Sequence, residues 1–265
     1  MKFAVNYSHA AADLLEAGQI DFDLFKFPDW PDFVPQNGLI RKPYVHYTLA
    51  AGNGSQAAVD WQMIAGLRAR TASPLVNTHL MAPAGLEPDD PAQVEAAIQG
   101  MVADLQDLVA RFGAENVVVE NMPLYVQNRH MRVAIEPATI QRVVGESGCK
   151  FLLDTAHARI TSAALGIDVY DYINALPVNR LGELHVTGVG WHDGERIDHL
   201  ELLAEDWEVF DWVMAHIAAG HWLQPKVVSF EYGGAGEVFR WRTEVRVLAE
   251  QTPRLFAAVQ AARHN

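Results

Sequence analysis

Short apolar runs alternate with longer helical patterns along the whole chain, and this alternation constrains the fold more than any other feature. Eight runs of four to six residues are rich in Val, Phe, Tyr and Leu, as is typical of strands covered on both faces. They span residues 2–7, 22–27, 44–49, 75–80, 117–121, 151–154, 183–187 and 227–231. Eight strands alternating with helices in 265 residues match the size of a (β/α)8 TIM barrel. We therefore expect an α/β fold with a single barrel domain over residues 1–265.

Most segments between these strands carry helix signals. Asp90 can cap a helix that begins at Pro91 and ends before Gly113. Similar patterns predict helices over residues 55–70, 136–147, 168–176, 206–220 and 239–263. The segment FPDWPDFVPQNG holds three prolines and predicts a loop between the second and third strands. A doubly wound open sheet is the alternative fold, but it predicts a glycine-rich turn after an early strand, and NYSHAAA contains no glycine.

Composition narrows the class of protein. No apolar stretch reaches the roughly 20 residues that span a bilayer, and the first residues do not resemble a signal peptide. Cys149 is the one cysteine, so we expect neither disulfides nor a thiolate metal site, and a cytoplasmic location. The 33 acidic residues exceed the 20 Lys and Arg, giving a net charge of −13, which disfavours binding to duplex DNA. No nucleic-acid or membrane partner is expected, and the oligomeric state is left open.

Side chains that can bind metals stand at the ends of six consecutive predicted strands. They are His46, His79, Glu120, Asp154, His185 and Glu231. A barrel gathers the carboxyl ends of its strands around one mouth, and an unpaired carboxylate beside an apolar run would be costly. His157, three residues after Asp154, and the Asp198-His199 pair can join them. The series predicts a metal site. The remaining histidines are predicted not to be ligands: His9, His130, His192, His216, His221 and His264.

The string LDTAH, residues 153–157, resembles the D-T-x-H signature of endonuclease IV-type barrels. The ordered set of candidate ligands resembles the xylose isomerase-like TIM-barrel superfamily, and Glu120-Asn121 with the HVTG…IDH stretch resembles the DUF692 group. That group includes multinuclear iron enzymes that modify peptide-derived substrates. The resemblance implies that Glu120, Asp154, His185 and Glu231 are core ligands. It also implies that His46, His79, His157, Asp198 and His199 hold a second and a third metal ion.

The sequence departs from the group at one point. The pattern usually spaces its last pair of ligands as D-x-H, whereas Asp198 and His199 are adjacent. Neighbouring side chains of an extended segment point apart, so both can serve one ion only if the chain bends there.

The ligand chemistry favours two or three divalent ions, such as Fe, Zn or Mn, because the set holds imidazoles and carboxylates but no thiolate. Three reactions fit: an iron-dependent oxidase, a sugar isomerase or epimerase with Glu120 and Glu231 as proton shuttles, and a metal-dependent hydrolase such as a phosphodiesterase. A barrel that only binds is a fourth possibility. We expect a small-molecule or short peptide substrate. The candidate substrate contacts are Asn6, Asn121, Arg159 and Arg196, and Asn77, Asn121 and Thr187 are candidate partners of the ligating histidines.

Overall fold

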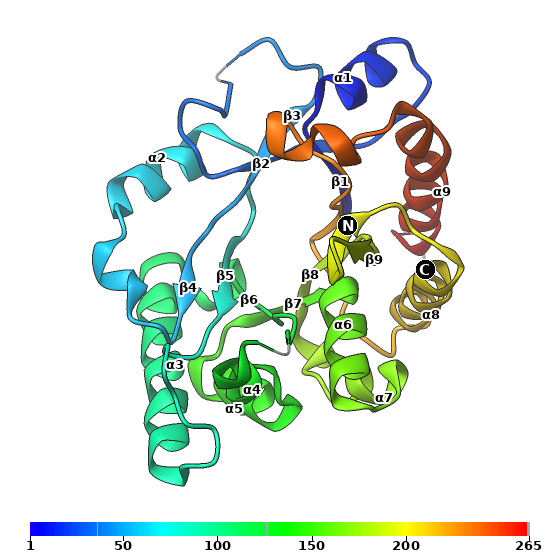
Figure 1. Cartoon of the computed structure of the whole chain (residues 1–265). Coiled ribbons are helices and arrows are strands. Elements are labelled where there is room, and N and C mark those ends of the chain that lie inside the picture. Colours follow the sequence, from blue (N-terminus) through cyan, green and yellow to red (C-terminus); the bar gives the residue numbers. More distant parts are fainter. Residues whose placement is uncertain (36, 126, 264–265) are drawn as a thin grey trace.

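The protein is a ring of parallel strands with helices around its outside, as the computed structural model shows for residues 1–35, 37–125 and 127–263 (Figure 1). The strands of the ring are β1 Lys2–Asn6, β2 Leu24–Pro28, β3 Lys42–His46, β4 Ala50–Ala51, β5 Val76–Leu80, β6 Val117–Glu120, β7 Lys150–Asp154, β8 Leu181–Val186 and β11 Val227–Phe230. They follow one another in the order β3-β2-β1-β11-β8-β7-β6-β5-β4, and each neighbouring pair is parallel. His264 lies outside the described residues.

The third strand of the barrel is split in two. Its first piece, β3, pairs with β2, and its second piece, β4, pairs with β5. Between the pieces, the side chain of Asn77 takes over the pairing: it accepts from Tyr47 N at 2.7 Å and donates to Tyr47 O at 2.9 Å. An amide side chain can do this because it carries the same donor and acceptor as a peptide group. The predicted eight-stranded barrel is confirmed, but its third strand is not the continuous run of residues 44–49.

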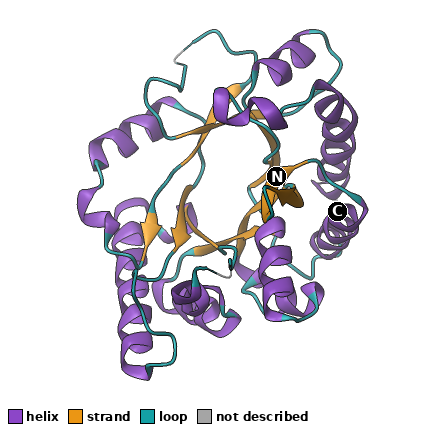
Figure 2. Cartoon of the chain, in the orientation of Figure 1, coloured by secondary structure: helices purple, strands orange, loops and turns teal. Residues whose placement is uncertain are grey.

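The helices cover the outer face of the ring (Figure 2). They are α1 His9–Glu16, α2 Trp61–Arg70, α3 Pro91–Phe112, α4 Arg132–Ile135, α5 Pro137–Ser147, α6 Thr155–Leu165, α7 Val169–Asn174, α8 Ala204–Ala218 and α9 Val245–Arg263. Asp90 caps α3 as predicted, with its side chain accepting from two backbone N–H groups. The described residues between β2 and β3 form no helix, also as predicted. The sequence pattern missed α1, α4 and α6. None of the helices in the described part of the chain is long and apolar enough to cross a membrane.

A hairpin that was not among the predicted elements follows β8. Its strands are β9 Gly188–His192 and β10 Glu195–Leu200, which pair in antiparallel fashion. Asp193 and Gly194 between them both have positive φ, 50° and 80°, which is the requirement of the tightest hairpin turns. The pairing register shifts between Ile197 and Leu200. The hairpin therefore bends just where the last two candidate ligands lie.

The inside of the barrel is layered. Alternate residues of each strand face inward, and the layers near the amino ends of the strands are apolar. They are formed by Ala4, Leu24, Tyr44 and Val227 and by Leu75, Val118 and Leu152. Two residues further along the same strands, the inward positions hold Lys26, His46, Glu120 and Asp154. The apolar layers fill the barrel from below, so the polar side chains gather at its carboxyl end.

Candidate metal centre

The barrel brings all nine predicted ligands to one end. Three groups of them place ligand atoms within 4.8 Å of one another: His46 with His79 and Glu120, His46 with His185 and Glu231, and Glu120 with Asp154 and His157. The hairpin adds the other two, since Asp198 Oδ2 lies 3.0 Å from His157 Nε2 and His199 Nε2 lies 3.9 Å from Glu231 Oε2. That these side chains bind metal stays a prediction.

Glu120 stands at the centre of the set. Its Oε2 lies 3.4 Å from His79 Nε2 and 3.8 Å from His46 Nε2, while its Oε1 lies 3.4 Å from His157 Nδ1 and 3.5 Å from His185 Nδ1. Burial acts to raise the pKa of Glu120, but the surrounding histidines hold it well below its usual range. The carboxylate is therefore ionised and shared between the two groups of which it is a member.

Three histidines are held in the orientation that metal ligands adopt. The Nδ1–H group of His79 donates to Leu49 O at 3.0 Å, that of His157 to Asn121 O at 2.8 Å, and that of His199 to Glu231 O at 2.8 Å. A carbonyl can only accept, so in the neutral ring each bond fixes the tautomer and leaves Nε2 as the nitrogen that can bind a metal ion. Each of the three Nε2 atoms lies within 4 Å of a carboxylate oxygen of the mouth.

Several atoms of the mouth have no hydrogen-bond partner among the described residues, although they are buried. They include Glu120 Oε2, Asp154 Oδ2 and His185 Nδ1. Buried carboxylate oxygens are normally hydrogen-bonded, because burying a polar group without a hydrogen bond costs roughly 2–7 kcal/mol, and a charged group costs more. Oxygen and nitrogen atoms that converge without partners suit a bound cation. The residues present therefore fit divalent metal ions.

The chain bends at Asp198 and His199, as it must if these adjacent side chains are to serve one ion. His199 adopts a φ of 59°, in the left-handed region, at the point where the hairpin register shifts. The bend turns both side chains to the same side, and His199 Nε2 lies 3.7 Å from Asp198 Oδ1. A residue other than glycine in this conformation costs about 1 kcal/mol or more, so surrounding contacts must hold it.

Three residues of the site were missed by reasoning from the strand ends alone. Lys26 Nζ donates to Glu231 Oε1 and lies 3.0 Å from His185 Nε2. Glu183 Oε1 lies 2.9 Å from the same nitrogen and accepts from the Tyr44 hydroxyl. Burial lowers the pKa of Lys26 to about 8, so the side chain is mainly an ammonium at neutral pH. Lys26 and Glu183 could have been found because each is a charged residue in the middle of an apolar run, LFKF and LGEL. A buried charge needs a partner of opposite charge or a hydrogen bond.

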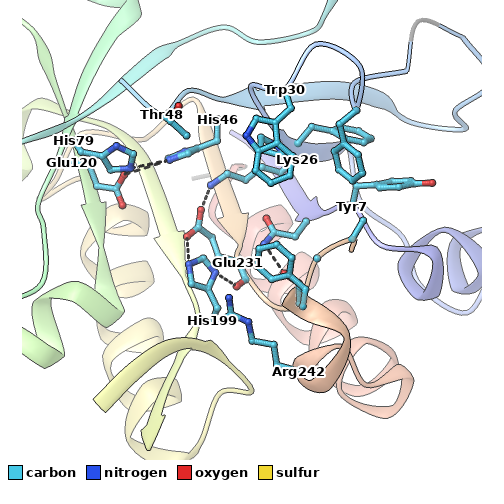
Figure 3. A pocket seen from close by; sticks show the side chains of 18 of the residues that line it. Tyr7, Lys26, Trp30, His46, Thr48, His79, Glu120, His199, Glu231 and Arg242 are labelled. Carbon is cyan, nitrogen blue, oxygen red and sulfur yellow. Dashed lines mark hydrogen bonds and ion pairs between the residues drawn. The ribbon is translucent and has the colours of Figure 1, made fainter. Parts of the chain in front are cut away.

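A cavity of about 370 Å³ opens over the ligands (Figure 3). Its inner wall is formed by Lys26, His46, His79, Glu120, His157, His199 and Glu231, and its outer wall by Tyr7, Phe27, Trp30, Phe33, Phe239 and Arg242. The rings of Tyr7 and Phe27 stack with centroids 4.7 Å apart. One wall is thus charged and the other is aromatic, and the space between them is the size of a small-ligand pocket.

The predicted substrate contacts divide between the cavity and other places. Asn6 lines the cavity and donates to Gly233 O at 3.2 Å. Arg159 pairs with Asp206 and Glu205, and Arg196 borders a separate pocket. Of the four predicted contacts, Asn6 alone is among the residues that line the cavity, and Asn121 is buried. Their roles in substrate binding stay predictions.

The predicted partners of the histidines also divide. Asn121 is such a partner through its backbone O, which accepts from His157 Nδ1 at 2.8 Å. Its side chain pairs with the backbone of Asp154: Asp154 N donates to Asn121 Oδ1 at 2.8 Å, and Asn121 Nδ2 donates to Asp154 O at 3.1 Å. Asn77 Nδ2 lies 3.0 Å from His46 Nε2. Thr187 donates to Leu200 O, away from the histidine rings.

The histidines set aside by the sequence lie outside the groups of candidate ligands. They are His9, which faces Tyr7, His130, His192, which stacks on Trp241, and the neighbouring His216 and His221.

Comparisons with known proteins agree with this architecture. The sequence model of the family described as RiPP precursor modification enzyme MbnB/TglH/ChrH matches residues 54–223. A UPF0276 protein of Acaryochloris marina is 27% identical over 144 residues, which is 54% of this chain and 47% of the relative. A UPF0276 protein of Paraburkholderia phytofirmans is 30% identical over 105 residues, 40% of this chain and 32% of the relative. The chain thus spans about half the length, or less, of these curated relatives.

Two solved structures share the fold. A crystal structure of D-psicose 3-epimerase in the presence of D-fructose superposes with a TM-score of 0.55 at 14% identity and covers 97% of each chain. Endonuclease IV from Thermus thermophilus superposes with a TM-score of 0.51 at 15% identity over 98% of this chain and 99% of its own. At these identities the likeness shows the barrel fold alone. Since the family model covers well over half of the residues, the chain belongs to the MbnB/TglH/ChrH family of RiPP precursor modification enzymes.

Proposed function

We propose that residues 1–265, as a single domain, form a metal-dependent enzyme that modifies a small polar or peptide-derived substrate. Two or three divalent ions, iron in the favoured version, would lie in the mouth. The observation that carries the proposal is the convergence on Glu120: four histidine rings lie within 3.8 Å of its two oxygens, and one of those oxygens is buried without a hydrogen-bond partner among the described residues.

The ligand groups indicate how the ions would be held. Glu120 would bridge an ion held with His46 and His79 and an ion held with Asp154 and His157, and Asp198 would support the second. His185, His199 and Glu231 form the remaining part of the shell. Bound ions would supply Lewis acidity and, if they are iron, redox chemistry.

The cavity supports a substrate of limited size. About 370 Å³ accommodates a small molecule or the end of a peptide, not a folded protein. The aromatic wall of Tyr7, Phe27 and Trp30 would exclude water from one side of the substrate and pack against its apolar part. Asn6 and Arg242 offer donors for its polar groups. A family whose members modify peptide precursors is consistent with such a substrate.

An isomerase or epimerase is the second candidate, because Glu120 and Glu231 line the same cavity and could exchange protons with one substrate. It is less favoured, since Glu231 is already engaged by Lys26 and four metal ligands would suffice for that chemistry. A phosphodiesterase is disfavoured by the net charge of −13, which would repel a nucleic-acid backbone.

Metal analysis of freshly purified protein tests the proposal. We expect two or three equivalents of iron, whereas zinc would favour a hydrolase, and a single Mn or Co with ketose isomerisation would favour the second candidate. His46→Ala and His79→Ala should each lower the metal content. His216→Ala is the matched control, because His216 packs against Trp212 and lies outside the groups of candidate ligands. The proposal is wrong if the protein binds no metal or if both mouth variants keep the full content.

A further inference from the structure

Among the described residues, Lys26 is the one lysine that lines the cavity, and it points into the candidate ligands (Figure 3). It lies on β2, is 5% exposed, and donates to Glu231 Oε1. Its Nζ atom also lies 3.0 Å from His185 Nε2. A buried ammonium is stable only beside negative charge, and here that charge comes from a side chain predicted to bind metal.

The three groups of ligands differ in whether the protein already supplies a cation. The group of His46, His185 and Glu231 contains the carboxylate that Lys26 occupies. In the other two groups, the basic side chains that face the carboxylates of Glu120 and Asp154, within the described part of the chain, are all histidines. One group therefore has its counter-charge built in, and two do not.

The number of charges in the mouth also favours two divalent ions over three. Five carboxylates lie in or directly behind it: Glu120, Asp154, Glu183, Asp198 and Glu231. Two divalent ions and the ammonium group of Lys26 carry five positive charges, which balance these carboxylates before the guanidinium group of Arg242 on the outer wall is counted. A third divalent ion would leave the buried centre with an excess of two positive charges, which desolvation makes unfavourable.

We propose that the ammonium group of Lys26 takes the place of a third metal ion, so that the mouth binds two. One ion would lie in the group of His46, His79 and Glu120, and the other in the group of Glu120, Asp154 and His157. Glu231 would then be held by Lys26 and not by metal. This inference rests on the proposed metal-dependent function and fixes the number of ions that it leaves open.

Metal stoichiometry tests the inference directly. Wild-type protein, Lys26→Met and Lys26→Arg are each dialysed anaerobically against excess Fe²⁺ and then against metal-free buffer, and bound iron is counted by mass spectrometry. Methionine keeps much of the volume of lysine without its charge, and arginine keeps the charge. We expect two equivalents in the wild type, three in Lys26→Met, and two in Lys26→Arg. Circular dichroism checks that each variant is folded, and Lys26→Gln replaces Lys26→Met if the latter does not fold.

The outcomes separate the two proposals. Three equivalents in the wild type, with Lys26 in place, would overturn the inference and leave the metal-dependent function standing. Two equivalents of iron in folded Lys26→Met or Lys26→Gln would also overturn the inference and leave the metal-dependent function standing. A wild type that binds no iron, zinc or manganese would overturn the proposed function and the inference together.

Discussion

The two sides of the barrel mouth both hold histidines and carboxylates, but one side also holds a buried lysine, so their charges are balanced differently. The Glu120 side consists of His46, His79, Glu120, Asp154, His157 and Asp198, and the Glu231 side consists of Lys26, Tyr44, Glu183, His185 and Glu231. Among the described residues, Glu120 Oε2 and Asp154 Oδ2 on the first side, and Glu183 Oε2 and His185 Nδ1 on the second, are buried without a hydrogen-bond partner. The second side also holds an ammonium group, because Lys26 is paired with Glu231. The first side therefore has no lysine to balance its carboxylates, whereas the second side has one.

The largest effect is expected from removing the charge at the centre of the Glu120 side. Glu120→Gln keeps the shape of the side chain but takes away the carboxylate shared by two ligand groups. We expect metal content to fall to one equivalent or none and metal affinity to fall more than ~100-fold, beyond the cost of losing an outer partner. Competition with a chelator measures the affinity. Glu95→Gln, on the exposed face of α3, is the control and should change neither value. Unchanged metal content in Glu120→Gln would contradict the assignment.

On the Glu231 side, Glu183 should act through His185 without touching metal. Its Oε1 lies 2.9 Å from His185 Nε2, which leaves His185 Nδ1 facing Glu120 Oε1 at 3.5 Å and Asp154 Oδ2 at 3.8 Å. His185 can therefore serve the ion proposed for the group of Glu120 and Asp154. Glu183→Gln weakens that support, and we expect metal affinity to fall ~10–100-fold. Ser229→Ala is a matched control, because Ser229 is buried on the next strand and its hydroxyl has no partner among the described residues. Equal affinities in the two variants would show that Glu183 only fills space.

How far the sequence could predict this difference depends on where each residue lies along its strand. The Glu120 side could be predicted because His46, Glu120 and Asp154 end their strands and His79 is one residue from the end of its own, and a barrel brings strand ends together. Lys26 lies mid-strand, where a lysine in LFKF equally suggests a side chain pointing to solvent. Its inward direction depends on the barrel register, which pairs Lys26 with Tyr44.

The break in the third strand and the bend in the hairpin could not be predicted, for a different reason. The break between β3 and β4 depends on Asn77, which contacts Tyr47 from 30 residues away in sequence. The bend at His199 depends on the pairing of β9 with β10, which local polarity does not reveal. In both cases a long-range contact overrides the local pattern. The same bend explains how adjacent Asp198 and His199 can share one mouth.

A smaller effect is expected from pH, and it should arise on the Glu120 side. Burial acts to lower the pKa of His157, but Asp154 and Asp198 outweigh it and raise the pKa to about 10. Without metal, His157 therefore holds a proton at neutral pH, and an ion must displace it. Metal affinity should rise with pH, about 10-fold per unit between pH 6 and 8 from this group.

Calorimetry in buffers of different ionisation enthalpy counts the released protons. Asp198→Asn removes one of the charges that hold the proton on His157, so it should release a smaller fraction of a proton per ion. Metal binding without proton release in the wild type would contradict the prediction.

The smallest effect is expected one step further from the ions, at Tyr44. Its hydroxyl donates to Glu183, which in turn supports His185. Tyr44→Phe should lower the free energy of unfolding by about 1.5–3 kcal/mol, as for a hydrogen bond to a charged group, and lower metal affinity less than Glu183→Gln does. Tyr172→Phe, which loses a 2.7 Å hydrogen bond to Ile135 O elsewhere in the fold, should lower stability without changing metal affinity. Urea denaturation and chelator competition measure the two quantities. If Tyr44→Phe changes stability alone, like its control, the chain of contacts that supports His185 ends at Glu183.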